Sequence, residues 1–431
     1  MKVNTIFFLL ALVALIISCN QTLQISAEQT AEISEEQTIA GATVLAFGPD
    51  NVLFIGNSKE ATIHAVNTEA ISIGDPVPYN MEGFDHMISE KLGIAPRELI
   101  VMDMKIHPLS QEAYVAIRLG PQPDAKSVIT IVNPATGAIR FLEVNSSNST
   151  SITLKNPASD DLLFWEETPA SALSITDIDY HNGFIYVAGL TNSDFASNLR
   201  KIAYPFDDTQ EAVKSIEIYH AVHTQNETRA PIRTMLFEDL NGASTLIASY
   251  TCTPLVTIPT TEIQSAASIT GKTIAELGYG NTPIDMLVVT TQGFDGTISK
   301  SLLVTHKNRG GSMIPLSSVE AGANGDGMVG QRAMFATGLE GIQEIPTANV
   351  MQLDIQNPQM LAVLRRNIDT GEIDLVSELT GTFLRLSDFI SEYDFPDYRY
   401  PESQEPTKKY HDMVKQMEGY PKLTSEGMNR N

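Results

Sequence analysis

Short runs of apolar residues, many of them β-branched or aromatic, begin near Gly41 and are separated by clusters of Gly, Pro, Asn, Asp and Ser. The first stretch, TVLAFGPDNVLFIGNSKEATIHAVNT at residues 43–68, contains three such runs, with breaks at Gly-Pro-Asp-Asn and at Gly-Asn-Ser. Runs of this length bounded by turn-forming residues indicate β-strands. The stretch therefore predicts strand, turn, strand, loop and strand.

The same order of runs recurs along the chain. Aligned on the first strand, residues 44–57 match five later segments: 103–118, 177–192, 233–252, 285–307 and, less cleanly, 342–366. A third run follows each pair, as TIHAVN, VITIVN, LRKIAYPF, PLVTIP, SMIPL and EIDLVSEL, and fainter fourth runs include AIRFLEV, VKSIEIYHA and TIAELG. Six such units, spaced by roughly 50 to 75 residues, are typical of four-stranded propeller blades around one axis. Residues 41–386 are thus predicted to be all-β, as a six-bladed β-propeller; seven blades or a pair of β-sandwiches are the alternatives.

Two segments lie outside the repeats. Residues 74–99 carry Phe84, Met87, Ile88 and Leu92 at helical spacing, which predicts a small helical insertion between the first two blades. Residues 387–431 are polar and tyrosine-rich and form a C-terminal extension. We expect this extension to pack against the outside or the rim of the propeller.

The N-terminal residues 1–18 have the pattern of a secretory signal peptide. One positive residue, Lys2, precedes an uncharged apolar run at residues 6–17 that is too short to cross a bilayer comfortably. The end of this segment, Ile-Ile-Ser-Cys at residues 16–19, resembles the bacterial lipobox, in which a signal peptidase cuts before a cysteine that becomes lipidated. The resemblance implies that Cys19 carries acyl chains that anchor the mature chain to a membrane without a transmembrane helix. The alternative is a signal peptide whose cysteine has no such role.

The residues after this cysteine bear on where the protein is held. Residues 19–40 are polar and acidic and predict a lipid anchor followed by a flexible tether. Asn20 is not the Asp that resembles an inner-membrane retention signal. The expected location is therefore extracytoplasmic, as a bacterial lipoprotein of the outer membrane.

Composition excludes one class of partner and one source of stability. The chain has 52 acidic against 28 basic residues, a net charge of −24. This charge repels a phosphate backbone, so nucleic acid is not an expected partner. With Cys19 lipidated, Cys252 is the remaining thiol, so no disulfide can form within the mature chain and its stability must come from a packed core.

The turn Phe-Gly-Pro-Asp-Asn, residues 47–51, lies between two apolar strands. A turn of this kind resembles a blade of the six-bladed propellers grouped with gluconolactonases, strictosidine synthases and NHL repeats. At the level of pattern, the resemblance covers residues 41–386. It implies a propeller channel, which in the lactonases holds a metal through acidic and amide side chains. No stretch here matches those ligand motifs, so the resemblance assigns no ligand residues.

Antiparallel blades bring the starts of first strands, the ends of second strands and the connections between blades to one face of a propeller. In the alignment, equivalent first-strand positions hold Asp103, Asp177, Arg233 and Asp285. Ends of second strands add Arg118, Asn192, Cys252, His306 and Arg365. One interpretation is structural: each Asp caps its own blade by accepting backbone N–H groups. The other is functional: a polar channel pairs Arg233 with a carboxylate, or the three aspartates bind a divalent cation such as Ca²⁺.

The stretch YHAVHTQNETRAPIRTM, residues 219–235, is interpreted as the connection from the third blade to the fourth. It carries His220, His223, Glu227, Arg229 and Arg233, which we expect to approach one another and the channel aspartates. The two histidines, with Cys252, offer transition-metal ligands. However, a strand would point His220 and His223 to opposite faces. Binding of an anion or carboxylate by Arg229, Arg233 and the histidines is the favoured interpretation.

Three functions are consistent with these patterns. The leading hypothesis is a lipid-anchored propeller that binds a small polar or peptide-like ligand, or a partner protein, at its channel face. The enzymatic alternative is a metal-dependent hydrolase or lactonase that uses Asp103, Asp177 and Asp285 as ligands and His306 as a base. The third is a scaffold that docks a membrane complex through its outer face or through residues 74–99. The sequence has no nucleophile elbow, Walker loop or dinucleotide fingerprint.

Overall fold

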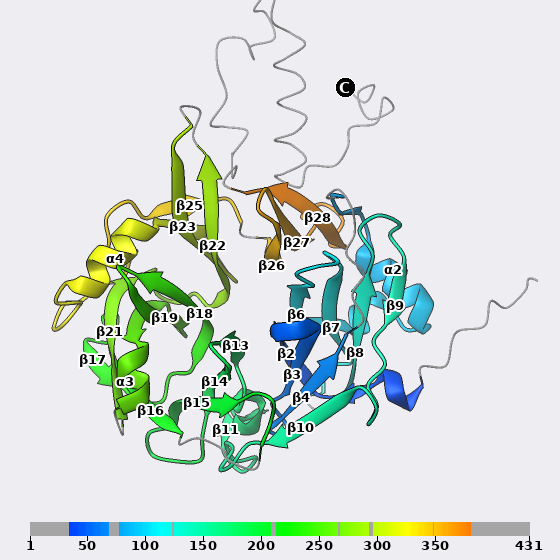
Figure 1. Cartoon of the computed structure of the whole chain (residues 1–431), viewed down its shortest axis with the longest axis horizontal. Helices are drawn as coiled ribbons and strands as arrows, with labels where there is room; N and C mark the ends of the chain where they lie inside the picture. The colour runs from blue at the N-terminus through cyan, green and yellow to red at the C-terminus, as the bar shows by residue number, and fades with distance from the viewer. Residues whose placement is uncertain are drawn as a thin grey trace, which may run out of the picture.

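The computed structural model describes residues 34–68, 77–122, 125–207, 213–265, 268–292, 296–347 and 349–380. The predictions for Cys19, for the tether up to residue 33 and for the extension at 387–431 lie outside the described residues. Within the described ranges the chain is mostly β with few helices, and its sheets are arranged as a propeller (Figure 1). None of the helices in these ranges is long and apolar enough to cross a membrane.

Nearly all of the predicted strands form. The first and second strands of the repeats pair as antiparallel hairpins. These hairpins are β2 (Ala42–Phe47) with β3 (Val52–Asn57), β6 (Leu99–Ile106) with β7 (Ala113–Leu119), β13 (Asp177–His181) with β14 (Phe184–Leu190), β18 (Ile232–Leu240) with β19 (Ala243–Tyr250), β22 (Pro283–Gln292) with β23 (Ile298–His306), and β26 (Val350–Asn357) with β27 (Met360–Arg366). The third strands follow as β4 (Thr62–Asn67), β8 (Lys126–Val132), β15 (Ser197–Ala203), β20 (Pro254–Pro259), β24 (Gly311–Pro315) and β28 (Ile373–Leu379).

Turn chemistry explains why the hairpins form where they do. Asn182-Gly183 and Asn241-Gly242 have positive φ at both residues, as type I′ hairpin turns require. Asp50 and Asn51 also adopt positive φ in the Gly-Pro-Asp-Asn turn, and short polar residues tolerate this region best. The turn residues that separated the apolar runs therefore close the hairpins.

The outer strands come from less regular places. They are β10 (Ser149–Thr153) on β4, β9 (Ile139–Phe141) and β1 (Ile39–Ala40) on β8, β16 (Lys214–His220) on β15, β21 (Ser268–Glu276) on β20, β25 (Gln343–Ile345) on β24 and β5 (Asn80–Met81) on β28. A short strand, β17 (Gln225–Glu227), adds to β16, and β11 (Leu163–Phe164) with β12 (Thr168–Pro169) forms a separate hairpin. The outer strand of the first sheet was not predicted, because its residues follow the second unit.

The sheets do not follow one another around the axis in sequence order. The innermost strands contact each other in the cycle β2, β6, β26, β22, β18, β13 and back to β2 (Figure 1). A separate buried apolar cluster lies between each neighbouring pair of sheets. The first two sheets are thus exchanged relative to chain order: after β9 the chain returns along the outer edge of β4 as β10 and then enters β13.

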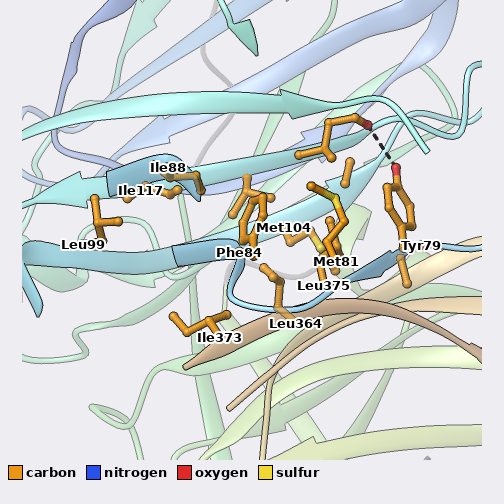
Figure 2. Packing of buried hydrophobic residues seen from close by; sticks show 14 of the residues in the cluster. Tyr79, Met81, Phe84, Ile88, Leu99, Met104, Ile117, Leu364, Ile373 and Leu375 are labelled. Carbon is orange, nitrogen blue, oxygen red and sulfur yellow. Dashed lines mark hydrogen bonds between the residues drawn. The ribbon is translucent and has the colours of Figure 1, made fainter. Parts of the chain in front are cut away.

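The last sheet is completed by the predicted insertion. Residues 80–81 pair with β28 as β5, and α2 (Phe84–Leu92) follows, as its helical spacing predicted. Phe84, Ile88 and Leu92 are buried, whereas Met87 is 39% exposed. Figure 2 shows Phe84 and Ile88 in one cluster with residues of β6, β7, β27 and β28. The insertion therefore joins the last sheet to its neighbour in space.

The remaining helices are short and lie at the edges of the sheets. They are η1 (Glu35–Gln37), η2 (Pro49–Asn51), η3 (Pro96–Glu98), η4 (Ala170–Leu173), α3 (Thr260–Ser265) and α4 (Leu316–Asn324). One further feature is unusual: β16 runs parallel to β21 at residues 215–218 and 268–271, so two neighbouring sheets are also joined at their outer edges. We call this junction the β16–β21 seam.

Candidate functional site

Most innermost strands begin with an irregularity that redirects side chains at the axis. The antiparallel register shifts between Ala42 and Val44, Val101 and Asp103, Ile232 and Thr234, Pro283 and Met286, and Val350 and Gln352. A β-bulge at a strand start locally bends the strand and turns a side chain away from the regular pleat. Arg233 is itself the extra residue in its strand, and Asp103 and Asp285 lie at the same irregularity in theirs.

The three aligned aspartates join neighbouring sheets. Each accepts a backbone N–H from the next innermost strand: Asp103 Oδ2 from Leu45 at 2.7 Å, Asp177 Oδ2 from Met235 at 2.6 Å and Asp285 Oδ2 from Leu353 at 2.9 Å. The Oδ1 atoms of Asp103 and Asp177 also accept N–H groups from their own strands. Among the described residues, capping of the residue's own strand is thus observed for Asp103 and Asp177 but not for Asp285, and all three aspartates also hold a neighbouring sheet. Both oxygens of Asp103 and of Asp177 therefore accept backbone N–H groups.

Two further aspartates that sequence reasoning missed do the same. Asp179 accepts the N–H of Phe237 at 3.2 Å, and Asp354 accepts the N–H of Ile106 at 2.7 Å. Burial raises the pKa of Asp179 to about 6, against the opposing effect of its hydrogen bonds. Asp179 lies two residues after the aligned Asp177, on the same face of its strand, and that spacing was the available signal for it. Asp354 lies in the sixth first strand, which the alignment matched less cleanly and for which it gave no equivalent position.

The central cation of the channel is Lys105, which was also missed. Its Nζ lies 3.3 Å from Asp285 Oδ1 and 3.7 Å from Asp103 Oδ1. Burial alone would lower the pKa of Lys105, but the charges of Asp103 and Asp285 outweigh burial and raise this pKa well above its ordinary value. Burial raises the pKa of Asp103 to about 6, although Lys105 opposes the rise. Lys105 therefore compensates the aspartates at the axis.

Arg233 lacks the ion pair that we expected. Among the described residues, no carboxylate lies within 4.0 Å of its guanidinium, and its Nε is buried without a hydrogen-bond partner. Burial lowers the pKa of Arg233, with a smaller opposing effect from the charge of Asp177. The oxygens of Asp177 accept the N–H groups of Ile178 and Met235.

The second-strand ends do not form one common set, because each has local partners. Arg365 pairs with Glu378 at 3.0 Å, and Arg118 Nε donates to the carbonyl of Gly120 at 3.1 Å. His306 is buried, with Nε2 3.2 Å from Ser312 Oγ, and burial lowers its pKa to about 4.

The other candidate positions on exposed loops also have local surroundings. Arg229 is exposed and its Nε donates to the carbonyl of Asp194 at 2.9 Å. Asn192 is exposed, and Cys252 lies partly buried in a turn with φ of 66°.

The two histidines of residues 219–235, His220 and His223, come together away from the axis. His220 ends the outer strand β16, and a turn closed by the Thr224 N–H and the His220 carbonyl at 2.9 Å leads into β17. Glu227 Oε2 lies 2.9 Å from His220 Nδ1, and Glu227 Oε1 lies 2.5 Å from His223 Nδ1. The expectation of opposite faces was wrong, because His223 lies in the turn rather than in the strand. The histidines also do not lie beside Arg233 at the channel mouth as we expected, because β16 and β17 are outer strands and Arg233 is on the innermost strand β18.

Ligand atoms of His220, His223 and Glu227 all lie within 4.8 Å of one another. Among the described residues, this is the one group of three or more His, Cys, Asp or Glu side chains that meets this distance; it includes neither Cys252 nor the channel aspartates. Burial would raise the pKa of Glu227, but hydrogen bonds from His220 and His223 outweigh burial and lower this pKa to about 2. The Glu227 carboxylate is therefore ionised at neutral pH.

A second carboxylate lies behind this group. Glu276 ends β21 and is fully buried; its Oε1 accepts a hydrogen bond from Thr253 Oγ1 at 2.9 Å. Its Oε2 lies 3.8 Å from His220 Nε2, and neither atom has a hydrogen-bond partner. Burial raises the pKa of Glu276 to about 7.

No protein-family model matches this chain, and no curated protein matches it. Similar solved structures include extracellular domains 1-2 of Drosophila Semaphorin 1b, at 9% identity and a TM-score of 0.34 over 81% of this chain and 86% of that chain. The PQQ-bound aldose sugar dehydrogenase of Streptomyces coelicolor is similar at 10% identity and 0.34 over 80% and 96%. A luciferin-regenerating enzyme is similar at 10% identity and 0.20 over 80% and 93%. At these values the propeller assignment rests on the strand pairing, and the neighbours carry no functional argument.

Proposed function

We propose that this chain is a six-bladed β-propeller that binds a small carboxylate-bearing molecule at its axial channel, and that Arg233 receives the carboxylate. The count of six is supported by the closed cycle of innermost strands and by the buried cluster between each neighbouring pair. The observation that carries the binding function is the partly buried guanidinium of Arg233, whose Nε has no partner.

The cost of such a group is the physical reason for the proposal. A charge that is partly buried without a partner loses part of its hydration, and this costs free energy that a partner of opposite charge would offset. Lys105 is compensated by Asp103 and Asp285, whereas Arg233 is not. The guanidinium fork matches a carboxylate with two parallel hydrogen bonds. A ligand carboxylate would thus provide the missing partner.

The surroundings restrict the ligand further. Five aspartates lie on the other innermost strands of the ring: Asp103, Asp177, Asp179, Asp285 and Asp354. The whole chain carries a net charge of −24. A polyanion would be repelled by this charge. A molecule with a single carboxylate, on a neutral or zwitterionic body such as a short peptide, satisfies Arg233 at the lowest electrostatic cost.

The test is calorimetric titration of the purified protein with a panel of dipeptides and their C-terminal amides. Arg233→Gln is compared with Arg229→Gln, a matched control whose arginine is exposed. We expect a dipeptide to bind the wild type and the control, and the amide and Arg233→Gln each to weaken binding about ten- to hundredfold, the value of one charge-assisted hydrogen-bonded pair. Binding that ignores both changes, or no binding by any dipeptide in the panel, contradicts the proposal.

We also propose that lipidated Cys19 anchors the propeller to a membrane surface, so that the propeller lies outside the cytoplasm. The support is the signal pattern of residues 1–18 and the small Ser18 before the cysteine. Metabolic labelling with a radioactive fatty acid tests this directly. Wild-type protein should incorporate label and fractionate with membranes, and Cys19→Ser should do neither. Equal labelling of Cys19→Ser refutes the anchor and leaves the channel proposal unaffected.

A further inference from the structure

We propose that the hairpin formed by β16 and β17 holds a divalent transition-metal ion, with Zn²⁺ as the best match, through His220, His223 and Glu227, and that Glu276 orients His220. This site is separate from the axial channel and does not depend on the function proposed for it. Two imidazoles and one carboxylate form a ligand set typical of zinc sites that keep a fourth position open for water.

The backbone of the hairpin sets the spacing of the three ligands. His220 pairs with Gln225 and Ile218 pairs with Glu227, so the side chains of His220 and Glu227 lie on the same side of the two-stranded ribbon. Thr224, with φ of 58°, closes the turn that brings His223 back over them. The imidazole ring centroids are 4.2 Å apart. The three side chains therefore converge through local geometry.

The distances are close to those of a coordination sphere. A tetrahedral ion with bonds of about 2.0 to 2.1 Å places its ligand atoms about 3.3 Å apart. The Nδ1 atoms of His220 and His223 lie 2.9 Å and 2.5 Å from Glu227 oxygens. Shifts of less than about 1 Å, which rotation of side chains supplies, convert these contacts into metal ligation.

The buried atoms behind the group are the independent observation. His220 is 1% exposed and Glu276 is 0% exposed, yet His220 Nε2 and Glu276 Oε2 have no hydrogen-bond partner and face each other at 3.8 Å. A metal-bound histidine usually donates its second ring N–H to a carboxylate, which fixes the tautomer and the orientation of the ring. With Nδ1 of His220 on the ion, its Nε2–H points at Glu276. Thr253 in turn holds the other oxygen of Glu276.

Access and charge agree with this assignment. The side chain of His223 is 47% exposed and that of Glu227 is 15% exposed, so an ion can reach the site from solvent. Among the described residues, no lysine or arginine forms an ion pair with Glu227 or Glu276. A divalent cation would therefore neutralise these two carboxylates. His220 ends β16 and Glu276 ends β21. A bound ion would therefore link β17 and the turn that carries His223 to the ends of the two strands of the β16–β21 seam.

The experiment uses full-length protein without a polyhistidine tag, stripped with chelator and titrated with ZnCl₂ by calorimetry, with Co²⁺ absorption as a second readout of coordination. His223→Gln is the main variant, because that imidazole is half exposed and its loss should not prevent folding. His86→Gln is the matched control: His86 also lies beside a surface glutamate, Glu372, at 3.5 Å. We expect one equivalent of Zn²⁺ to bind the wild type and the control.

His223→Gln should lower Zn²⁺ affinity at least about tenfold and abolish the tetrahedral Co²⁺ spectrum. Glu276→Gln should weaken affinity about ten- to hundredfold while stoichiometry stays at one, as expected of a residue that positions a ligand. Zn²⁺ should also raise the melting temperature of the wild type and not that of His223→Gln. Wild type that binds less than one equivalent, or His223→Gln that binds as tightly as His86→Gln, overturns the proposal and leaves a hydrogen-bonded cluster that holds no ion.

Discussion

Replacing Lys105 by methionine should destabilise the propeller more than the loss of any exposed lysine. The Nζ of Lys105 lies 3.3 Å from Asp285 and 3.7 Å from Asp103, and its side chain is only 20% exposed. Methionine keeps a similar length of apolar chain but removes the charge. The perturbation therefore leaves the axial carboxylates in place without their cation.

The magnitude follows from these distances. With an effective dielectric constant of about 20, unit charges at these two separations attract by about 5 and about 4.5 kcal/mol. Desolvation of the ammonium offsets much of this attraction, and removing one partner of a buried pair typically costs about 3 to 5 kcal/mol. Because a fifth of the Lys105 side chain is exposed, we expect the lower end, about 3 kcal/mol.

The assay is urea unfolding at pH 7 followed by far-ultraviolet circular dichroism, with midpoints and slopes compared. Lys300→Met is the control, because Lys300 is 52% exposed and pairs with Glu238 at 3.2 Å; it should cost less than about 1 kcal/mol. The double variant Lys105→Met with Asp285→Asn should recover part of the loss, because it also removes an unpaired carboxylate.

The pH dependence gives a second, independent check. Burial raises the folded-state pKa of Asp103 to about 6, and the loss of Lys105 should raise it further. Below this pKa the carboxyl takes a proton and no longer needs a cation, so the penalty of Lys105→Met should shrink between pH 7 and pH 5. A penalty no larger than that of Lys300→Met, or one that grows as the pH falls, would refute the role of Lys105 as the axial counter-charge.

Two other substitutions test the packing and the buried charges. Glu378→Gln isolates a carboxyl whose pKa burial raises to about 7 from 4.5, beside Arg365 at 3.0 Å. The folded state holds this proton more tightly than the unfolded state. The wild type should therefore lose stability relative to Glu378→Gln, by up to about 3 kcal/mol, as the pH rises from 4.5 through 7. Urea unfolding of both proteins at the two pH values measures this difference, and a difference that does not change with pH would contradict the raised pKa. Gly189→Ala places a Cβ 2.1 Å from the carbonyl oxygen of Ser174, so the free energy of unfolding should fall by about 1 to 3 kcal/mol. Gly325→Ala is the control and should be nearly neutral, because the nearest atom to its Cβ is 3.4 Å away. Equal stability of the two variants in urea unfolding contradicts the close approach at Gly189.

Local patterns were sufficient to predict most strands and turns. Asn182-Gly183 and Asn241-Gly242 close hairpins because few residues other than Asn and Gly accept positive φ at low cost, and this preference acts within two residues. The helix at Phe84–Leu92 was predicted because its apolar residues recur at helical spacing, which is also a local signal. The alignment of first strands also indicated that Asp103, Asp177, Arg233 and Asp285 share one region, since a repeated unit repeats its geometry.

The partners of these residues were decided by contacts between distant segments. The exchange of the first two sheets depends on β10, which comes from residues 149–153 to pair with β4, and the last sheet is completed by residues 80–81. Lys105 became the axial cation because Asp285, 180 residues away in the chain, lies opposite it. His220 met Glu276 because two outer strands run parallel at the seam. The sequence by itself determined most of the strands and the turns between them. Only the tertiary structure decided which strands became neighbours and which side chains leave the regular pleat, because these choices are made by burial of apolar faces over the whole ring and not by any local signal.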